Sequence, residues 1–228
     1  MTTTIRWGIL STASIARRRV VPALQSSRNG EVVAVASRDA DRARAFAAEQ
    51  DIPRSYGSYE ALLGDPNIDA IYIGLPNNLH AEWAMHCAAA GKPTLCEKPL
   101  ALDAKQAQQM VDAFATRGVP FAEAFMYRFH PQTRRVLELV AEGVLGDLHA
   151  INAVFSFRLP PEAAENIRLQ ASLGGGSLMD VGCYCVNLMR LATGAEPEAV
   201  TAQALIGKTS GVDERFTGTL RFPGGVLG

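Results

Sequence analysis

The sequence predicts an α/β fold, in which a parallel, doubly wound sheet precedes a smaller α+β domain with a predominantly antiparallel open sheet. In the first half of the chain, short apolar runs alternate with helical patterns, as they do in a parallel sheet covered by helices on both faces. Small residues, STASIA at 11–16, join the first apolar run to the first helical pattern, which is typical of a Rossmann dinucleotide-binding domain. Beyond this half, strand patterns follow one another. We therefore expect domains at 1–122 and 123–228.

Each element of the first domain follows from its periodicity. Five apolar runs predict buried strands: IRWGIL (5–10), EVVAVAS (31–37), IDAIYIGL (68–75), PTLCEK (93–98) and VPFAEAF (119–125). The helical patterns predict helices over 14–25, 40–49, 58–64, 78–90 and 103–117. The segments GDPN at 64–67 and AGKP at 90–93 supply the signals that end two of these helices.

The second domain has a different pattern. We expect a helix over 131–142, ending at Gly143, and a strand over 148–159, where LHAINAVFSFRL alternates apolar and polar residues. A helix over 177–193 and strands near 198–206 and 214–222 follow. The final RFPGGVLG has a Pro-Gly-Gly turn and two residues of a return strand, so we expect this sheet to be truncated.

The turn at 11–16 is the first candidate nucleotide site. The three fingerprint glycine positions hold Ser11, Ala13 and Ala16, whose small side chains still permit close approach of a pyrophosphate. The hydroxyl groups of Ser11 and Thr12 are candidate phosphate donors, and the following helix directs its free N–H groups at the same point. We expect the cofactor to contact Ser11, Thr12, Ala13 and Ile15. Taken alone, the stretch is equally consistent with any tight turn between a strand and a helix.

The end of the second strand predicts which dinucleotide binds. An NAD-binding unit usually has an acidic residue there, which bonds the ribose 2′-hydroxyl. Here Ser37 ends the strand and Arg38 follows it, and we expect the Ser37 hydroxyl and the Arg38 guanidinium group to contact a 2′-phosphate. Asp39 is explained as the cap of the next helix. We expect NADP, with NAD and an ordinary surface role for Arg38 as the alternatives.

Two further strand ends supply candidate residues, because ligands of open parallel sheets bind beyond the carboxyl ends of the strands. We expect cofactor contacts at Leu75, Pro76, Asn77 and His80, and at Glu97 and Lys98. A buried ammonium group beside a cofactor is suited to polarising an oxygen. The alternatives are that Asn77 or Asn78 caps a helix, that His80 packs in the core and that Lys98 is a surface residue.

The helix over 177–193 carries a polar face beside its apolar stripe. Asp180, Tyr184 and Asn187 are spaced by four and three residues, so we expect them on one side of the helix. Asp180 also suits the start of a helix and Tyr184 the rim of a core, which are the structural alternatives. In combination, the three polar groups favour a functional site.

Composition excludes several other classes of function. The formal net charge is −1 and no apolar run reaches the length of a membrane span, so we expect neither nucleic acid nor membrane as a partner. No signal peptide pattern begins the chain, and four cysteines do not form a disulfide framework. Cys183 and Cys185 face different ways on a helix, which argues against a metal site. We expect a cytoplasmic, metal-free protein.

Six segments together resemble the glucose–fructose oxidoreductase / inositol dehydrogenase family, often called Gfo/Idh/MocA. They are STASIA, SRDADRA, LPNNLH, CEKPLAL, EAFMYRFHP and GGGSLMDVGCY, and they span essentially the whole chain. The last two are similar to the branch of dimeric dihydrodiol dehydrogenases and NADP-dependent xylose dehydrogenases. The resemblance implies that Lys98 and Tyr184 perform the acid–base chemistry with Asp180 beside them, and that Arg128 contacts cofactor or substrate.

The activity that this resemblance implies is hydride transfer between NADP and an aldose sugar such as D-xylose, or a trans-dihydrodiol. A free phenol has a pKa of about 10, so the Lys98 ammonium group is needed to make Tyr184 an effective base. The resemblance also implies a homodimer if the C-terminal sheet is complete. The alternatives are a non-catalytic NADP-binding sensor, an inactive truncated family member and an NAD-linked inositol-type dehydrogenase.

Overall fold

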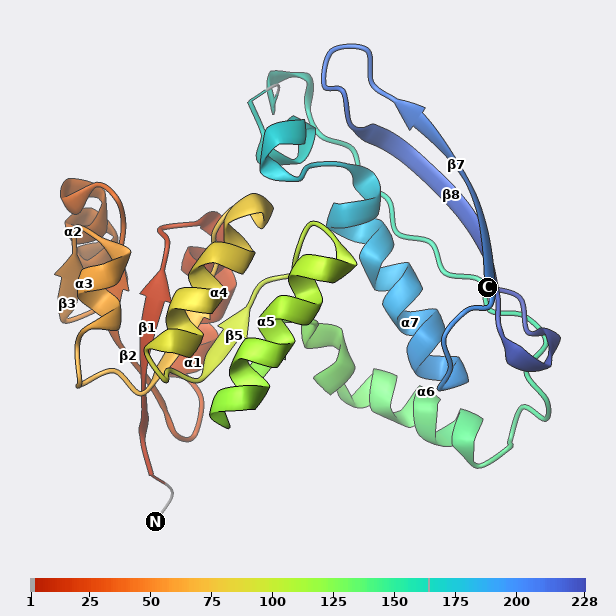
Figure 1. Ribbon diagram of the computed structural model, residues 1–228, viewed down its shortest axis with the longest axis horizontal. Coiled ribbons are helices and arrows are strands. Elements are labelled where there is room, and N and C mark those ends of the chain that lie inside the picture. Colours follow the sequence, from red (N-terminus) through yellow and green to blue (C-terminus); the bar gives the residue numbers. More distant parts are fainter. Residues whose placement is uncertain (1–2, 164) are drawn as a thin grey trace. The chain divides into compact units, whose positions relative to one another are not determined.

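The computed structural model describes residues 3–163 and 165–228, which fall into two compact units (Figure 1). The first unit ends at Ala124 and the second begins at Phe125. The expected α/β class is confirmed: the first unit holds a six-stranded parallel sheet, and the second a two-stranded antiparallel sheet.

The sheet of the first unit has the strand order β3-β2-β1-β4-β5-β6, with every neighbouring pair parallel. Its strands are β1 (Ile5–Leu10), β2 (Gly30–Ala36), β3 (Arg54–Tyr56), β4 (Ala70–Ile73), β5 (Thr94–Cys96) and β6 (Phe121–Glu123). The chain passes outward from β1 in one direction and then, from β4, in the other. The order therefore reverses between β1 and β4, which is where doubly wound sheets bind ligands.

Helices cover both faces of this sheet (Figure 1). They are η1 (Ala16–Val20), α1 (Val21–Gln25), α2 (Ala40–Glu49), α3 (Tyr59–Leu63), η2 (Asn77–Leu79), α4 (His80–Ala89) and α5 (Ala104–Arg117). One core layer holds Leu62 of α3, Trp83 of α4 and Phe114 of α5; the other holds Val21 of α1 and Phe46 of α2. The expected helix cap is confirmed, because the Asp39 carboxylate accepts the backbone N–H groups of Asp41 and Arg42.

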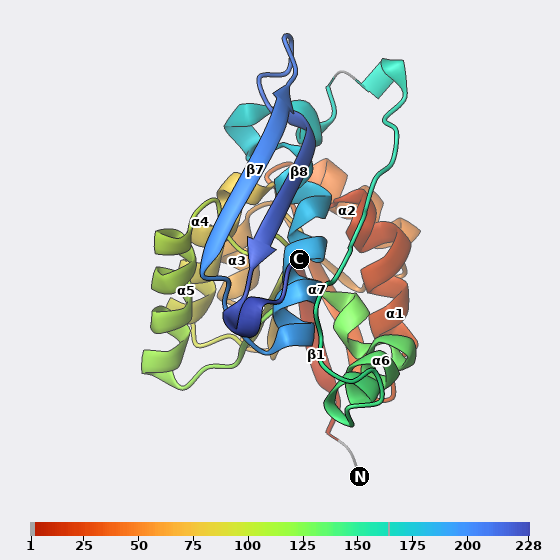
Figure 2. The ribbon, with the colours of Figure 1, turned by 90° about the vertical axis from the view of Figure 1, so that its right-hand side faces the viewer.

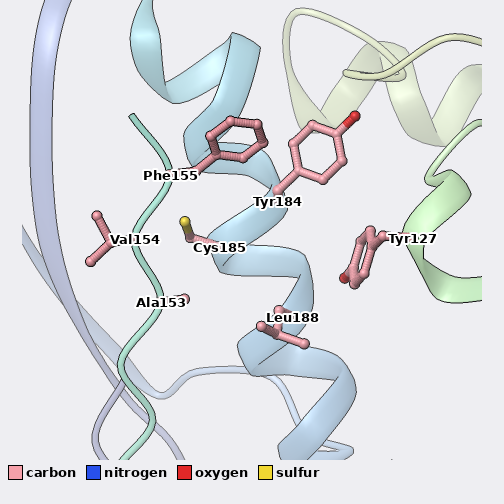
Figure 3. A pocket seen from close by; sticks show the side chains of 7 residues that line it. All are labelled: Tyr127, Ala153, Val154, Phe155, Tyr184, Cys185 and Leu188. Atoms are coloured by element: carbon pink, nitrogen blue, oxygen red, sulfur yellow. The ribbon is translucent and has the colours of Figure 1, made fainter. Parts of the chain in front are cut away.

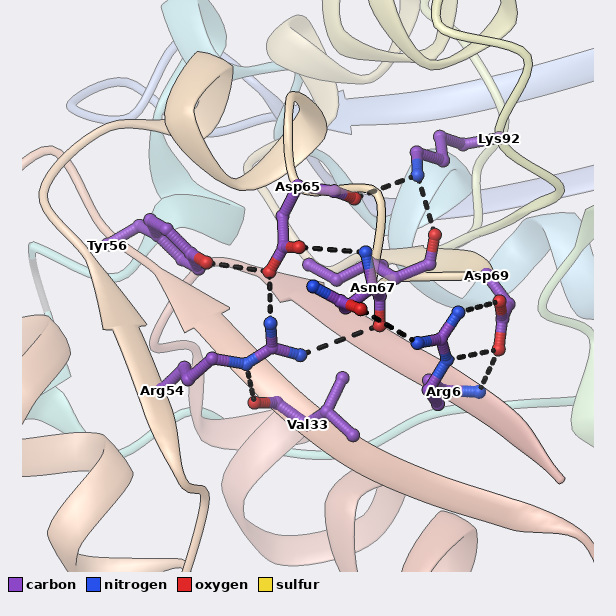
Figure 4. A network of polar contacts seen from close by, with 9 residues as sticks. Arg6, Val33, Arg54, Tyr56, Asp65, Asn67, Asp69 and Lys92 are labelled. Atoms are coloured by element: carbon purple, nitrogen blue, oxygen red, sulfur yellow. Dashed lines mark hydrogen bonds and ion pairs between the residues drawn. The ribbon is translucent and has the colours of Figure 1, made fainter.

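A polar network ties β3 to the amino-end side of the sheet (Figure 4). The Asp65 carboxylate accepts the Tyr56 hydroxyl at 2.7 Å and pairs with Arg54, while the Lys92 ammonium group donates to the backbone oxygens of Asp65 and Ile68. These bonds hold a three-residue edge strand that is too short and too polar for its periodicity to be recognised. The sequence analysis accordingly missed β3.

The neighbouring ion pair is expected to make the first unit less stable in acid. Arg6 contacts Asp69 through two nitrogens at 2.7 and 2.9 Å and also donates its backbone N–H. These bonds lower the pKa of Asp69 from 3.8 to about 2, so the stabilisation is present above pH 4 and is lost as the pH falls towards 2. Because both side chains are more than a third exposed, solvent screening limits the contribution to about 1 kcal/mol.

Asp69→Asn should therefore lower the free energy of unfolding by about 1 kcal/mol at pH 7 and by less near pH 2. Urea unfolding at the two pH values measures this difference. Asp51→Asn, at an exposed carboxylate, is the control and should change neither value. A pH-independent loss at position 69 would show that the ion pair is not the cause.

The second unit is built around one long helix and a hairpin (Figure 2). Its elements are η3 (Met126–Phe129), α6 (Pro131–Ala141), η4 (Pro161–Ala163), η5 (Ile167–Leu169), η6 (Ala171–Leu173), η7 (Leu178–Gly182), α7 (Cys183–Thr193), β7 (Ala199–Ile206), β8 (Asp213–Arg221) and η8 (Pro223–Gly225). The predicted hairpin strands are confirmed. A small core joins Met189 of α7 to Leu220 and Phe222 of the hairpin region.

The prediction of a strand over 148–159 is wrong. Only its beginning pairs: the Leu227 N–H donates to the His149 oxygen at 3.0 Å, and the Ile151 N–H donates to the Leu227 oxygen at 2.8 Å. Residues 151–159 form no strand, and Val154 and Phe157 are 90% and 53% exposed. The alternating pattern is real, yet no described strand lies beside this segment to complete a ladder.

Candidate active site

The first unit gathers its candidate residues at one edge of the sheet. β1, β2, β4 and β5 are parallel neighbours, so their carboxyl ends point the same way. The residues that follow these ends are those expected from the sequence: Ser11–Ala13, Ser37 and Arg38, Leu75–Asn77, and Glu97 and Lys98. The fold therefore brings four separate segments of the chain to one edge.

The turn after β1 keeps the backbone shape of a glycine-rich turn without the glycines. Ser11 has φ 112°, a conformation that an L-residue adopts at a cost of about 1–3 kcal/mol. Its hydroxyl donates to the Gly74 oxygen at 2.9 Å and accepts the Ala13 N–H at 2.9 Å, which stabilises the turn. This corrects one expectation, since the Ser11 hydroxyl hydrogen is used within the protein. Thr12 is half-buried and Ile15 is 41% exposed, so both present groups at the surface.

The end of β2 carries two guanidinium groups. Ser37 is buried and its hydroxyl accepts the Asp39 N–H at 3.2 Å, whereas Arg38 is exposed. Burial raises the pKa of Tyr59, and the positive charges of Arg38 and Arg42 act against that rise. The sequence analysis missed Arg42. It lies four residues after Arg38, in the first turn of α2.

The loop after β4 changes the role expected for His80. This side chain is fully buried, and its ring nitrogens lie 2.8 and 2.9 Å from the backbone oxygens of Pro99 and Leu75. Burial lowers the pKa of His80. Because both ring nitrogens already contact backbone oxygens, His80 cannot make the cofactor contact expected from the sequence. It instead links the loop after β4 to the loop after β5. Pro76 and Asn77 are half-buried and remain candidates.

The end of β5 places an acidic residue, Glu97, next to a basic residue, Lys98. Glu97 is half-buried and its Oε1 accepts the Tyr72 hydroxyl at 2.8 Å, while Oε2 faces the backbone N–H of Lys98 at 3.3 Å. Burial raises the pKa of Glu97, and both the Tyr72 hydroxyl and the Lys98 charge act against that rise. The edge thus presents a carboxylate and an ammonium group on consecutive residues.

The second unit surrounds Tyr184 with aromatic rings. The centroids of Phe125, Phe155 and Tyr127 lie 5.2, 5.5 and 5.8 Å from that of Tyr184. Tyr127, Phe155 and Tyr184 also line a cavity of about 280 Å³, together with Ala153, Val154, Cys185 and Leu188 (Figure 3). The Tyr127 hydroxyl donates to Asn187 at 2.6 Å, and Arg128 is exposed in the same η3 turn. The structure therefore places Tyr184 at a mostly apolar cavity.

Asp180 has a partner that the sequence analysis missed. The Arg168 Nε lies 2.6 Å from its Oδ2, and the guanidinium group lies 5.9 Å from the centre of the Phe157 ring. The helix that carries Asp180 begins with a π-helical turn, a feature often found at functional sites. No spacing in the sequence connects residues 168 and 180, because a loop folds back to bring them together.

Glycines allow this loop to fold back. A Cβ at Gly175 would lie 2.5 Å from the Arg168 oxygen, and one at Gly176, whose φ is 118°, would lie 2.0 Å from the Asp213 carboxylate. That carboxylate instead accepts the Ser177 hydroxyl at 2.8 Å and the Leu178 N–H at 2.7 Å. The start of the Asp180 helix is thus fixed by a side chain of β8.

Within 3–163 and 165–228, no three His, Cys, Asp or Glu side chains are grouped closely enough to hold a metal ion. In the same part of the chain, no helix combines the length and apolarity needed to cross a membrane.

The first unit has the strand order and the edge residues of a Rossmann-type dinucleotide-binding domain, and the second unit is a separate α+β unit. Residues 5–125 match the model of an oxidoreductase family with an NAD-binding Rossmann fold, and residues 133–228 match the Gfo/Idh/MocA C-terminal domain. The chain belongs to the Gfo/Idh/MocA family.

Several characterised proteins are similar to this chain over nearly its whole length. It is 48% identical to the NADP⁺-dependent D-xylose 1-dehydrogenase 2 of Haloferax volcanii, with 96% of this chain and 66% of that protein covered. It is 40% identical to mouse trans-1,2-dihydrobenzene-1,2-diol dehydrogenase, with 98% and 67% covered. A 3-ketoreductase from Actinomadura kijaniata, solved with NADP and TDP-benzene, is 37% identical with a TM-score of 0.92, with 99% and 68% covered. The chain spans about two thirds of the length of these relatives.

Proposed function

We propose that the protein is an NADP-dependent oxidoreductase that interconverts a hydroxyl and a carbonyl group of a sugar, such as an aldose, or of a cyclic diol. The observation that carries this proposal is Lys98, an ammonium group at the end of β5, on the sheet edge where Ser11–Ala13 and Arg38 also lie. Support comes from the relatives whose names specify D-xylose, a dihydrobenzene diol or an NADP complex.

The residues at this edge fit a phosphorylated dinucleotide. The Ser11 backbone adopts the left-handed conformation that a fingerprint glycine provides, and the adjacent Ala13 leaves room for a pyrophosphate. A helix begins directly after this turn, so its first N–H groups suit an anion. Arg38 and Arg42 are two exposed cations where a 2′-phosphate would be held. Asn77, Glu97 and Lys98 are the candidates for contacts with the nicotinamide half.

The chemistry is divided between the cofactor and the chain. When bound, NADP would supply the hydride chemistry, as acceptor during oxidation and as donor during reduction. Tyr184 takes the proton of the substrate hydroxyl during oxidation and returns it during reduction. The resemblance to the family assigns to the Lys98 ammonium group the role of assisting this proton transfer, and to Asp180, which pairs with Arg168, the role of orienting the polar groups around Tyr184. Arg128 remains a candidate contact to substrate or cofactor.

A substrate screen tests the reaction. The purified protein is incubated with NADP⁺ and a panel of aldoses and trans-dihydrodiols, and NADPH formation is followed by absorbance. We expect reduction of NADP⁺ with at least one compound of these classes. NADPH binding without turnover on any of them would overturn the enzyme proposal and favour the non-catalytic sensor.

Cofactor preference is tested with Arg38→Ala. The loss of charge-assisted hydrogen bonds to a 2′-phosphate should raise the dissociation constant of NADPH by about 10–100-fold, while that of NADH stays unchanged. Titration calorimetry with both cofactors measures this. Arg44→Ala is the matched control, because Arg44 is an exposed arginine of the adjacent helix α2 and pairs with Asp41. Equal losses for NADPH and NADH would remove the 2′-phosphate assignment.

We also propose that the protein is a cytoplasmic homodimer. All four cysteines are free thiols, which suits a reducing compartment. The β7–β8 hairpin exposes Val200, Leu205 and Ile206 by more than half, and such apolar surface favours self-association. Sedimentation velocity at several protein concentrations tests the dimer, and a concentration-independent monomer would exclude it.

A further inference from the structure

A buried tyrosine stands directly behind the proposed cofactor edge. Tyr72, in β4, is fully buried, and its hydroxyl donates to Glu97 Oε1 at 2.8 Å. It belongs to the core layer beneath α1 and α2 and takes no part in the chemistry proposed above. A phenol in a core usually packs and bonds a backbone group. This one bonds a carboxylate of the candidate site.

The surrounding residues make room for this bond. Gly74 follows β4, and a Cβ there would lie 2.9 Å from Tyr72 Cε1 and 3.3 Å from its hydroxyl oxygen. Such a contact would displace the ring that carries the hydroxyl. The Gly74 oxygen in turn accepts the Ser11 hydroxyl. The turn after β1 and the Tyr72 ring therefore both contact the same glycine.

The bond with Tyr72 divides the two oxygens of Glu97 between interior and edge. Oε1 accepts the buried Tyr72 hydroxyl, whereas Oε2 accepts the Lys98 backbone N–H at 3.3 Å and has a second lone pair for a further donor. We propose that Tyr72 is a positioning residue that fixes the Glu97 carboxylate so that Oε2 accepts a sugar hydroxyl of the bound dinucleotide. This inference rests on the proposed cofactor site and adds to it a residue that touches no ligand.

Electrostatics supports the same role. The groups that bear on Glu97 are Tyr72 on the neighbouring strand and Lys98 on its own strand end, and both favour the ionised carboxylate against the effect of burial. Burial also raises the pKa of Tyr72, so its hydroxyl stays protonated and remains a donor. Without the Tyr72 hydroxyl, Glu97 Oε1 would lose the hydrogen bond that offsets the cost of its burial. The Glu97 carboxylate would then rotate or take up a proton.

The test is Tyr72→Phe, which removes one hydroxyl and keeps the ring. Because the hydroxyls of the nicotinamide ribose are common to both cofactors, the dissociation constants of NADPH and NADH should rise by the same factor, about tenfold. This pattern differs from that of Arg38→Ala, which affects NADPH alone. Binding is measured by calorimetry and by quenching of the Trp7 and Trp83 fluorescence.

Tyr56→Phe is the matched control. Its hydroxyl bonds the Asp65 carboxylate at 2.7 Å on the opposite side of the same sheet, so the substitution should lower stability without changing either dissociation constant. A double-mutant cycle with Glu97→Gln completes the design. If Tyr72 acts through Glu97, Tyr72→Phe should change binding much less in the Glu97→Gln background than in the native one.

The outcomes separate the two proposals. Native affinity in Tyr72→Phe, or full additivity with Glu97→Gln, would overturn the positioning role and leave the cofactor site intact. A native protein that binds neither NADPH nor NADH would overturn the cofactor site and the positioning role with it. Weaker binding that also appears in Tyr56→Phe would show a general loss of stability rather than positioning.

Discussion

Replacing Lys98 by methionine is expected to lower kcat by about 10²–10⁴-fold while the dissociation constant of NADPH changes little. Methionine keeps the length of the stem but removes the ammonium group, which is the charge that the proposed acid–base chemistry requires. The position at the carboxyl end of β5, next to the half-buried Glu97, makes this lysine unlike one on an open helix surface. Steady-state kinetics on the substrate found by the screen, with calorimetry for NADPH, measures both quantities.

Lys105→Met is the matched control for this change. Lys105 is an exposed residue of α5 in the same unit, so its replacement removes the same charge from the surface and should leave kcat unchanged. Retention of native kcat in Lys98→Met would show that the proton transfer proceeds without this cation. Loss of NADPH binding together with activity would instead place Lys98 in cofactor binding alone.

Strong periodicity explains why most of the first unit was predictable. Short apolar runs with β-branched residues, bounded by turn signals, are typical of strands in a covered sheet, and IRWGIL and GEVVAVA are found as β1 and β2. Helix caps gave equally local signals, as Asp39 shows. The strand β3 carried no such signal, since Arg54 and Tyr56 are held by the Asp65 carboxylate rather than by an apolar face.

The alternating pattern at 148–159 led to a wrong prediction, because no described strand pairs with most of this segment. The side chains of 148–159 alternate as a strand requires, but strand formation also depends on backbone partners, and only its first residues pair with Leu227. Pairing is a property of the tertiary structure, which a local pattern cannot contain. The prediction of the two hairpin strands was confirmed, because only a short loop separates β7 from β8 and the strands that pair are also neighbours in the sequence.

In the candidate site too, the positions of some residues were predictable from the sequence, whereas the contacts of others were not. Parallel topology is sufficient to bring Arg38 and Lys98 to one edge, so their position followed from the order of strands and helices. Their neighbours did not: Arg168 reaches Asp180 through a folded loop, and Tyr72 reaches Glu97 across two adjacent strands. Long-range side-chain bonds of this kind leave no spacing in the sequence. They also changed the roles of His80 and Ser11, whose polar atoms are already engaged.

Tyr184→Phe is expected to lower kcat by about 10²–10⁴-fold, which is the usual effect of removing a general acid–base group. The ring is packed against Phe125 and Phe155, so phenylalanine should keep the fold and the shape of the cavity. NADPH affinity should stay native, because the proposed cofactor contacts of the first unit are unchanged. Kinetics and calorimetry on the same preparation separate loss of chemistry from loss of binding.

Tyr127→Phe gives the comparison within the same cavity. Its hydroxyl bonds Asn187 at 2.6 Å, so its loss should reduce the stability of the second unit by about 1 kcal/mol and leave kcat within a few-fold of native. The two substitutions remove the same atom from neighbouring aromatic residues, which excludes a general effect of cavity polarity. Equal activity in the two variants would mean that Tyr184 is part of the cavity wall and that the proton is exchanged with another group.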